Sequence, residues 1–363
     1  MSGRLLKAAA SKKIWEVTIV TKRSFGKTKE GREVFLYTLT NNKGVKAEIT
    51  NYGANLVNLV VLDGEGKERD VVLGFDDVSG YESNPSFFGA LIAPSANRIA
   101  KACFTIDGKT YELKKNNGPN NLHSDEELGS HKRIWDVKEG ENEVTFILKY
   151  KDGELGFPGN REFQVTYSLN EENELKISYK GTSDKNTVIN PTNHSYFNLK
   201  GHDQGKIEDH TIILYASNYT PADQESIPYG DIVSVEGTPM DLREETVIGD
   251  KIDSDFEQLN FAAGYDHNWV TDNYDKKVRK IAVVKSPAKD CVMEVYTDLP
   301  GVQFYAGNFI DEQKGKNGAG YTKRSGLCLE TQCYPDSINK ENFPSVVYGP
   351  EKAFESVTIY KFV

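Results

Sequence analysis

The 363-residue sequence lacks the features that mark several large classes of protein. It contains four cysteines, too few to hold a chain of this length together as a disulfide-linked extracellular scaffold. No stretch approaches the roughly 18 consecutive apolar residues that a membrane-spanning helix needs. The net charge of -10 leaves no broad basic surface for phosphate groups, which argues against nucleic acid as a partner. The composition is that of a soluble globular protein.

Targeting signals are also missing. The first residues, MSGRLLKAAASKKIW, include basic side chains but no apolar core of signal-peptide length, so we expect residues 1–12 to be a flexible terminus. One of two glycosylation sequons, Asn193–Ser195, would place a glycan inside the most informative motif of the chain. These observations predict a cytoplasmic protein that contacts no membrane, and we expect it to be a monomer.

The sequence contains no recognisable metal or nucleotide signature. Its six histidines show no His-x-x-x-His spacing, and no Cys-x-x-Cys pair could complete a zinc site. It has neither a phosphate-binding loop ending in Gly-Lys-Ser/Thr nor a Gly-x-Ser-x-Gly turn. We therefore expect no metal and no organic cofactor.

Short alternating runs rich in Val, Ile, Thr, Tyr and Phe, separated by Gly, Asn and Asp, dominate the sequence. This alternation predicts antiparallel strands joined by turns. The clearest run is FTIDGKTYEL, where Asp107-Gly108 is placed to turn a hairpin. Helical patterns are confined to two short stretches near residues 241–251 and 255–261. We therefore predict one large all-β domain over residues 1–363, a sandwich or barrel-like fold, with two separate all-β domains as the alternative.

Glu330 is the most unusual polar residue of a predicted strand. It lies in GLCLETQCYPDSIN, where a period of two places it on one face with Cys328 and Gln332. A carboxylate inside a strand is rarely buried without a partner. The pattern leaves three interpretations open: a side chain facing solvent, a structural salt bridge, or a functional group.

His194 raises the same question in NPTNHSYFNL, where one imidazole stands among hydroxyls, amides and aromatic rings. It could be a core histidine with satisfied hydrogen bonds or a catalyst. Five further residues have ordinary alternatives as turn residues, surface ion pairs or exposed side chains, namely Asn97, Arg98, His123, Asp266 and Gln303.

Eight motifs that include these residues follow one another in a consistent order, and the chain that carries them resembles the aldose 1-epimerases, or galactose mutarotases. The resemblance covers nearly the whole chain, from about Gly31 to Val363. Each motif alone is weak, whereas the ordered set is specific. The motifs are NYGANLVNLVVLD, VVLGFDD, GALIAPSANRIAKACFTIDGKTYEL, NNGPNNLHS, NPTNHSYFNL, GYDHNWV, GVQFYAGNF and GLCLETQCYPDSIN.

The resemblance implies a large antiparallel β-sandwich with an open cleft for a monosaccharide such as galactose or glucose. It implies that His194 is the general acid and Glu330 the general base, and that the two are adjacent, which their separation in sequence could not show. It also implies which residues line the sugar site, namely Asn97, Arg98, His123, Asp266 and Gln303. Two alternatives remain, a hexose 6-phosphate 1-epimerase, which should need a cationic clamp beyond Arg98, and a non-catalytic sugar-binding module.

The chemistry of a pyranose explains why two such groups suffice. Opening the hemiacetal ring requires a proton delivered to the ring oxygen and a proton removed from the anomeric hydroxyl. Rotation of the open aldehyde and closure on its other face then exchange the anomers. An unperturbed histidine is mostly neutral at pH 7. We therefore expect an acidic neighbour to raise the pKa of His194, with Asp266 as the candidate.

Overall fold

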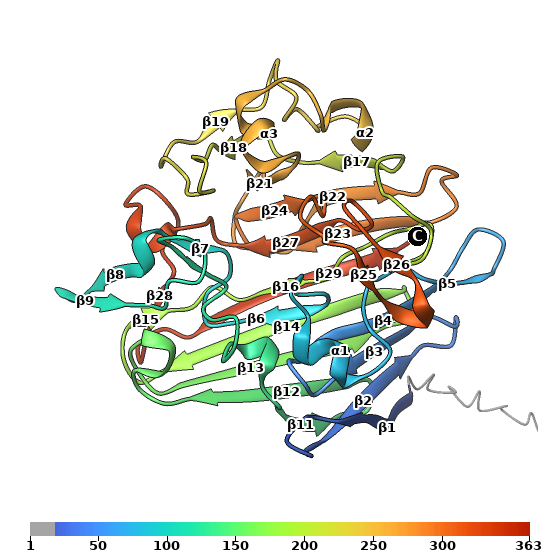
Figure 1. Ribbon diagram of the computed structural model, residues 1–363, viewed down its shortest axis with the longest axis horizontal. Coiled ribbons are helices and arrows are strands. Elements are labelled where there is room, and N and C mark those ends of the chain that lie inside the picture. The colour runs from blue at the N-terminus through green and yellow to red at the C-terminus, as the bar shows by residue number, and fades with distance from the viewer. Residues whose placement is uncertain (1–18) are drawn as a thin grey trace, which may run out of the picture.

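The computed structural model describes residues 19–363, which form a mainly β structure (Figure 1). The predicted flexible terminus, residues 1–12, lies outside the described residues. Two helices, α2 (Ile248–Lys251) and α3 (Glu257–Ala262), coincide with the two predicted helical stretches. A third, α1 (Val78–Ser83), was not predicted, and it begins after Asp77, whose side chain accepts a hydrogen bond from the Ser79 N–H. No helix in residues 19–363 is long and apolar enough to cross a membrane.

The first five strands form an antiparallel sheet in chain order. They are β1 (Ile19–Lys27), β2 (Glu33–Thr40), β3 (Lys46–Thr50), β4 (Leu56–Leu62) and β5 (Glu68–Asp70). A nine-stranded sheet has the order β11-β12-β13-β14-β29-β23-β22-β17-β20. Its strands are β11 (Asp136–Glu139), β12 (Glu143–Tyr150), β13 (Arg161–Leu169), β14 (Glu174–Ser183), β29 (Phe354–Phe362), β23 (Val292–Thr297), β22 (Arg279–Lys285), β17 (Thr211–Leu214) and β20 (Thr246–Val247).

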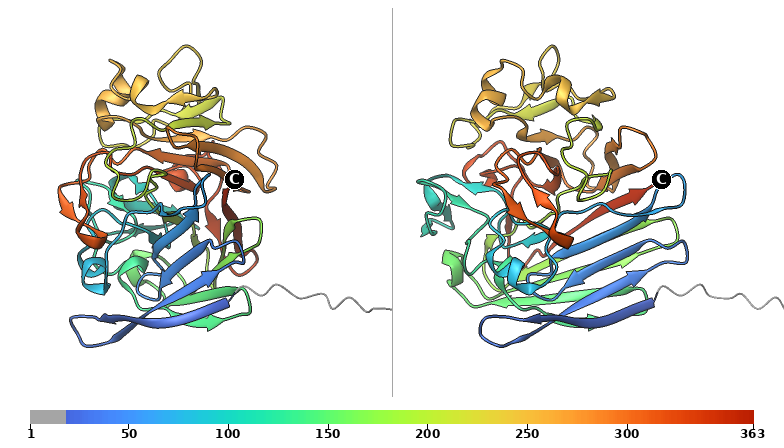
Figure 2. Two further views of the ribbon diagram at one scale, coloured as in Figure 1. Left: turned by 90° about the vertical axis from the view of Figure 1, so that its right-hand side faces the viewer. Right: turned by 45° about the vertical axis from the view of Figure 1, so that its right-hand side comes forward.

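These two sheets pack face to face, as Figure 2 shows for the blue strands of the first sheet and the green strands β12–β14 of the second. The alternation along β13 is complete, with every second residue buried. Tyr37 of β2 meets Phe146 of β12 edge to face, with ring centroids 5.8 Å apart. Buried apolar side chains from both sheets belong to one continuous core. The sandwich expected from the sequence is therefore confirmed.

A third sheet, toward the top of Figure 1, carries half of the candidate site. Its order is β19-β18-β21-β24-β27. The strands are β19 (Val233–Ser234), β18 (Asn218–Thr220), β21 (Asp266–Val270), β24 (Gly301–Tyr305) and β27 (Cys328–Gln332). In its ladder Gln303 pairs with Glu330, and Asp266 pairs with Tyr305. Adjacent strands therefore present these polar residues close together.

Short two-stranded ladders complete the structure. They pair β6 (Ala90–Ile92) with β16 (Thr192–His194), β7 (Arg98–Ile99) with β10 (Asn121–Leu122), β8 (Cys103–Ile106) with β9 (Lys109–Glu112), β15 (Thr187–Val188) with β28 (Val347–Tyr348), and β25 (Gln313–Lys314) with β26 (Gly320–Tyr321). The predicted Asp107-Gly108 turn joins β8 to β9, and both residues have positive φ, as a two-residue type I′ turn requires.

Gly89 allows β6 to reach its place beside β16. Its φ is +66°, and a Cβ there would lie 2.0 Å from the Leu56 carbonyl oxygen, so only glycine fits between β4 and β6. The Gly89 N–H donates to the carbonyl of His194, and Ala90 pairs with His194 in the ladder. The close approach of the chain at Gly89 thus fixes the strand that carries His194.

Candidate active site

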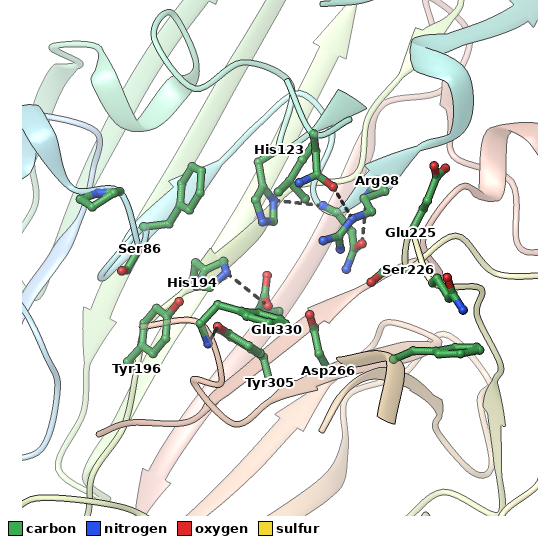
Figure 3. A pocket seen from close by; sticks show the side chains of 18 residues that line it. Ser86, Arg98, His123, His194, Tyr196, Glu225, Ser226, Asp266, Tyr305 and Glu330 are labelled. Atoms are coloured by element: carbon green, nitrogen blue, oxygen red, sulfur yellow. Dashed lines mark hydrogen bonds and ion pairs between the residues drawn. The ribbon is translucent and has the colours of Figure 1, made fainter. Parts of the chain in front are cut away.

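A cavity of about 430 Å³ opens between the third sheet and the loops around β6, β7 and β10 (Figure 3). Its size falls in the usual range for small-molecule sites. Six of the seven residues predicted from the sequence line it: Asn97, Arg98, His123, His194, Asp266 and Glu330. The seventh, Gln303, is buried beside the cavity and donates a hydrogen bond from Nε2 to Oδ1 of Asp266, 2.7 Å away. The structure therefore brings together residues that are far apart in the sequence.

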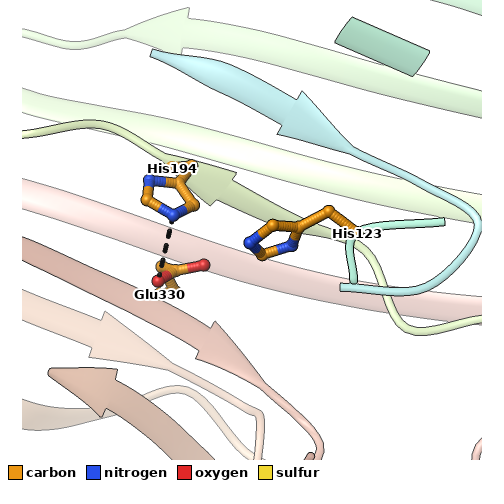
Figure 4. A group of neighbouring side chains, drawn as sticks. All are labelled: His123, His194 and Glu330. Atoms are coloured by element: carbon orange, nitrogen blue, oxygen red, sulfur yellow. Dashed lines mark ion pairs between the residues drawn. The ribbon is translucent and has the colours of Figure 1, made fainter. Parts of the chain in front are cut away.

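The side chains of His194 and Glu330 point toward each other (Figure 4), and both line the cavity. Nε2 of His194 lies 3.5 Å from Oε1 of Glu330, and the two side chains are 6% and 3% exposed. Glu330 is therefore not the solvent-facing strand residue that the sequence pattern allowed. The second carboxylate oxygen, Oε2, is buried without a hydrogen-bond partner among the described residues. Both residues line the cavity, which brings them within reach of a bound molecule.

Burial shifts the pKa values of this pair in opposite directions. Loss of solvent lowers the pKa of His194 to about 4. The expectation that Asp266 raises the pKa of His194 is therefore wrong, because burial dominates and Asp266 is not among the groups that shift it. Burial raises the pKa of Glu330 well above its ordinary value, the nearby charge of Asp266 raises it further, and Arg98 opposes the shift. Burial thus favours the neutral form of each group.

Arg98 and Asp266 form the polar wall beside this pair. The Arg98 guanidinium donates from Nε to Oδ1 of Asn117, 2.9 Å away, which helps to fix its orientation. Burial raises the pKa of Asp266, while Arg98 and the hydrogen bond from Gln303 act against that rise. A guanidinium and a carboxyl group held in this way can bind neighbouring hydroxyls in a fixed orientation.

His123 is held in one orientation by the chain itself. Its Nδ1 accepts a hydrogen bond from the N–H of Asn97, 3.1 Å away. Burial lowers the pKa of His123 well below its ordinary value, so the ring is neutral. A neutral imidazole whose Nδ1 accepts carries its proton on Nε2. His123 therefore offers an N–H donor to a ligand in the cavity.

The nitrogens of His123 and His194 and a carboxylate oxygen of Glu330 lie within 4.8 Å of one another, a spacing that could hold a metal ion. A histidine that binds a metal through one nitrogen almost always donates its other N–H to an acceptor. His123 does the opposite, because its Nδ1 accepts from Asn97 and its Nε2 has no free lone pair. The arrangement therefore suits hydrogen bonding to a substrate better than metal ligation.

Aromatic residues complete the cavity, and the sequence did not identify them. The ring of Phe87 lies 4.9 Å from His123 and 5.9 Å from His194. The ring of Tyr196 lies 5.1 Å from the ring of His194. Tyr196 follows His194 by two residues, and alternate residues of an extended chain share a face, so the sequence could have indicated this neighbour. Phe309 is 60% exposed and stacks on Tyr305 at the rim.

The loop that contributes Gln224, Glu225 and Ser226 to the lining carries no comparable signal in the sequence. A hydrogen bond from Asn120 Nδ2 to Oε2 of Glu225, over 3.1 Å, helps hold it at the cavity. Such a long-range contact depends on the finished fold.

Comparison with known proteins identifies relatives over most of the chain. The family model described as aldose 1-epimerase matches residues 36–361. A galactose mutarotase from Bos taurus is 40% identical over 344 residues, 94% of this chain and 98% of that protein. An aldose 1-epimerase from Escherichia coli (strain K12) is 34% identical over 92% of this chain and 96% of that protein. The crystal structure of an aldose epimerase homologue from C. elegans superposes with a TM-score of 0.82 at 27% identity, covering 95% of this chain and 99% of that one.

Proposed function

The chain belongs to the aldose 1-epimerase family, and we propose that it interconverts the α and β anomers of aldohexoses such as galactose and glucose through proton transfers at His194 and Glu330. The observation that carries the assignment of these residues is their geometry. Nε2 of His194 and Oε1 of Glu330 lie 3.5 Å apart, both almost fully buried, on the floor of a cavity large enough for a monosaccharide.

The reaction moves one proton in each direction between the sugar and this pair. Glu330, as the carboxylate, takes the proton of the anomeric hydroxyl, and His194, as the imidazolium, gives its Nε2 proton to the ring oxygen. The C1–O5 bond breaks, and the open aldehyde is left beside a neutral imidazole and a protonated carboxyl group. After rotation about the C1–C2 bond, the same transfers run backward and close the ring on its other face.

The buried environment favours this opening step. The pair is charged when the sugar ring is closed and neutral when the ring is open. Burial lowers the pKa of His194 and raises the pKa of Glu330, so both shifts stabilise the neutral pair. The attraction between the imidazolium of His194 and the carboxylate of Glu330, whose Nε2 and Oε1 atoms are 3.5 Å apart, acts against these shifts by stabilising the charged pair. The opposing effects bring the two protonation states closer in free energy, which suits reversible proton transfer.

The remaining residues hold the sugar. Arg98 and Asp266 provide donors and acceptors for hydroxyl groups from one wall, and His123 provides its Nε2–H. Asn97 keeps His123 in the donating tautomer, and Gln303 orients the carboxyl group of Asp266. We assign these five residues to substrate binding.

A hexose 6-phosphate is a less suitable substrate. Arg98 is the only lysine or arginine among the described residues that line the cavity, and it faces two carboxyl groups, Asp266 and Glu330. Glu225 adds a further carboxylate to the lining. A phosphate dianion would meet more negative than positive groups there.

Polarimetry of freshly dissolved sugars tests the function. The purified protein should accelerate the change in optical rotation of α-galactose and α-glucose far above the spontaneous rate, and should act weakly on α-glucose 6-phosphate. Rates equal to the spontaneous ones for both free sugars would overturn the proposal. A preference for the phosphorylated sugar would favour the alternative substrate.

Two features of the cysteines and the sequon support the proposed cytoplasmic location. All four cysteines are free, and three of them, Cys291, Cys328 and Cys333, are buried. Asn193 of the overlapping sequon is also buried, so a glycan could not attach to the folded chain. The location and the monomeric state remain predictions.

A further inference from the structure

A second cavity, of about 650 Å³, is separate from the candidate active site. It is larger than the cavity that holds His194 and Glu330, and the two cavities have no lining residue in common. Its lining comes mainly from the turn before β22, the chain that follows β27, and the segment that leads from β28 into β29. The proposed proton transfers use none of these residues.

The lining of this second cavity combines buried apolar side chains with accessible tyrosines. Leu299, Phe343 and Phe354 are almost fully buried and give the cavity an apolar inner surface. Tyr274 is 40% exposed, and Tyr348 is half-buried. A largely apolar surface with a small number of polar groups is the usual lining of a small-molecule site.

Three tyrosine hydroxyls of the cavity have no hydrogen-bond partner within residues 19–363, those of Tyr274, Tyr334 and Tyr348. Burial raises the pKa of all three, so each hydroxyl keeps its proton and can donate it to a ligand. The charge of Asp298 adds to the rise in the pKa of Tyr274 and of Tyr348. The carboxylate therefore lies in the same electrostatic environment as these donors.

Asp298 supplies an acceptor for the same ligand. Its Oδ1 accepts a hydrogen bond from the Val357 N–H, 2.9 Å away, whereas its Oδ2 has no hydrogen-bond or ion-pair partner in the described part of the chain. Partial burial raises the pKa of Asp298, and the Val357 N–H and the charge of Arg279 act against that rise. A partly buried carboxylate oxygen without a partner is a strong acceptor for a hydroxyl donor.

The charges of the lining favour an uncharged ligand. Two lysines, Lys276 and Lys352, and two carboxylates, Asp298 and Glu355, line the cavity. An anion would be attracted by the lysines and repelled by the carboxylates, and a cation would meet the reverse arrangement. Nζ of Lys352 also lies 4.7 Å from the centroid of the Tyr348 ring, a cation–π contact that already engages this charge.

We propose that the second cavity is a further saccharide-binding site, in which a neutral sugar places a C–H face of its ring on the apolar surface and exchanges hydrogen bonds with Tyr274, Tyr334, Tyr348 and Asp298. A pyranose presents C–H groups on its faces and hydroxyls around its edge. These groups match an apolar surface that is bordered by three hydroxyl donors and one carboxylate acceptor. Binding at this site needs no ring opening, so the inference does not depend on the proposed reaction.

Fluorine NMR of protein labelled with 3-fluorotyrosine tests the site without any turnover. The probes are methyl β-galactoside and methyl β-glucoside, because glycosides do not mutarotate. The signals of Tyr274 and Tyr348, identified by their loss in Tyr274→Phe and Tyr348→Phe, should shift and saturate as either glycoside is added. If these two signals do not move, the inference is overturned. If only the signals of Tyr196 and Tyr305 move, the sugar binds at the active-site cavity alone and the inference is again overturned.

Substitution of Asp298 tests the assigned contacts. Asp298→Asn keeps an acceptor for the Val357 N–H but removes the charge, and it should weaken glycoside binding about tenfold, the order expected when a hydrogen bond to a charged group is lost. Its kcat and KM for α-galactose should equal those of the unaltered protein. Tyr215→Phe is the control, because Tyr215 is 37% exposed and lines neither cavity, and its binding should be unchanged.

Charged sugars test the preference for a neutral ligand. Glucose 6-phosphate and protonated glucosamine should each bind at the second cavity more weakly than methyl β-glucoside. Tighter binding of either charged sugar, or an unchanged affinity in Asp298→Asn, contradicts the inference. An unaltered protein without mutarotase activity would refute only the proposed function, and the fluorine spectra would still decide whether the second cavity binds sugar.

Discussion

At the scale of single residues, the properties of His194 and Glu330 cannot be separated. Each has its pKa moved toward the other's by burial, and their charged and neutral forms differ only by the position of one proton. In the proposed mechanism the active state is therefore a pair that holds one transferable proton. Such a pair titrates in two macroscopic steps, and neither step belongs to one residue alone.

This pairing predicts the pH dependence of kcat/KM. On the acid side, a second proton enters as the pH falls toward the pKa of His194, about 4, and no group is left to accept the anomeric proton. On the alkaline side, the transferable proton is lost as the pH rises through the raised pKa of Glu330, and no group is left to protonate the ring oxygen. We expect a profile that falls on both sides, measured by polarimetry with the spontaneous rate subtracted. A profile that stays flat from about pH 3 to 10 would count against the pair.

The sequence could identify these residues but not their state. Residue patterns left Glu330 open between a solvent-facing, a structural and a functional group, because burial of a strand face depends on the sheets packed on it. The protonation of His194 was predicted in the wrong direction for the same reason. An acidic neighbour acts only through its charge, whereas the loss of solvent around the ring, which has the larger effect, is a property of the assembled site.

At the scale of strands and turns, local signals were reliable. The Asp107-Gly108 turn, the hairpin of β13 and β14 and the short helices α2 and α3 all follow from neighbouring residues. The period of two that placed Cys328 on one face with Glu330 is confirmed by the contacts of both with the ring of His194. What the pattern could not give is the pairing of β16 with β6 or the approach of β16 to β27, because these contacts join distant parts of the chain.

The glycine-rich segment from Gly315 to Tyr321 shows the limit of local reasoning. Its composition is typical of a flexible loop, yet buried side chains anchor both of its ends. Lys316 is buried and bonds to Asp70, to Asn58 and to the carbonyl of Val57, and Tyr321 is fully buried. The anchoring groups lie in a different sheet, more than 200 residues earlier. Composition alone does not reveal them.

At the scale of the whole molecule, the histidines determine how stability responds to acid. Burial lowers the pKa values of His131, His194, His210 and His267 to between about 3 and 4, and lowers the pKa of His123 well below its ordinary value. In the unfolded chain these groups bind protons below about pH 6.5. Between these values the unfolded state therefore holds more protons than the folded state, and acid favours unfolding.

We predict that the free energy of unfolding falls as the pH drops from about 6.5 toward 4. Glu330, Asp266, Asp298 and Asp336, whose pKa values are raised, act in the opposite direction but are fewer than the histidines. A net uptake of even one proton corresponds to about 1.4 kcal/mol per pH unit. Urea unfolding at a series of pH values measures this slope, and His210→Gln, far from the cavity, should make it shallower. A free energy of unfolding that is constant or rises over this range would show that the histidines are not held neutral.

The measurement that tests the central claim most directly is mutarotation of α-galactose by His194→Ala, by Glu330→Gln and by the double variant, with His210→Gln as a control for a buried histidine outside the site. Each single substitution should lower kcat by about 10²- to 10⁴-fold with the fold intact by circular dichroism. Because the two residues act as a unit, the double variant should be about as slow as the slower single variant. A near-normal rate for either single variant, or losses that multiply in the double variant, would contradict the account.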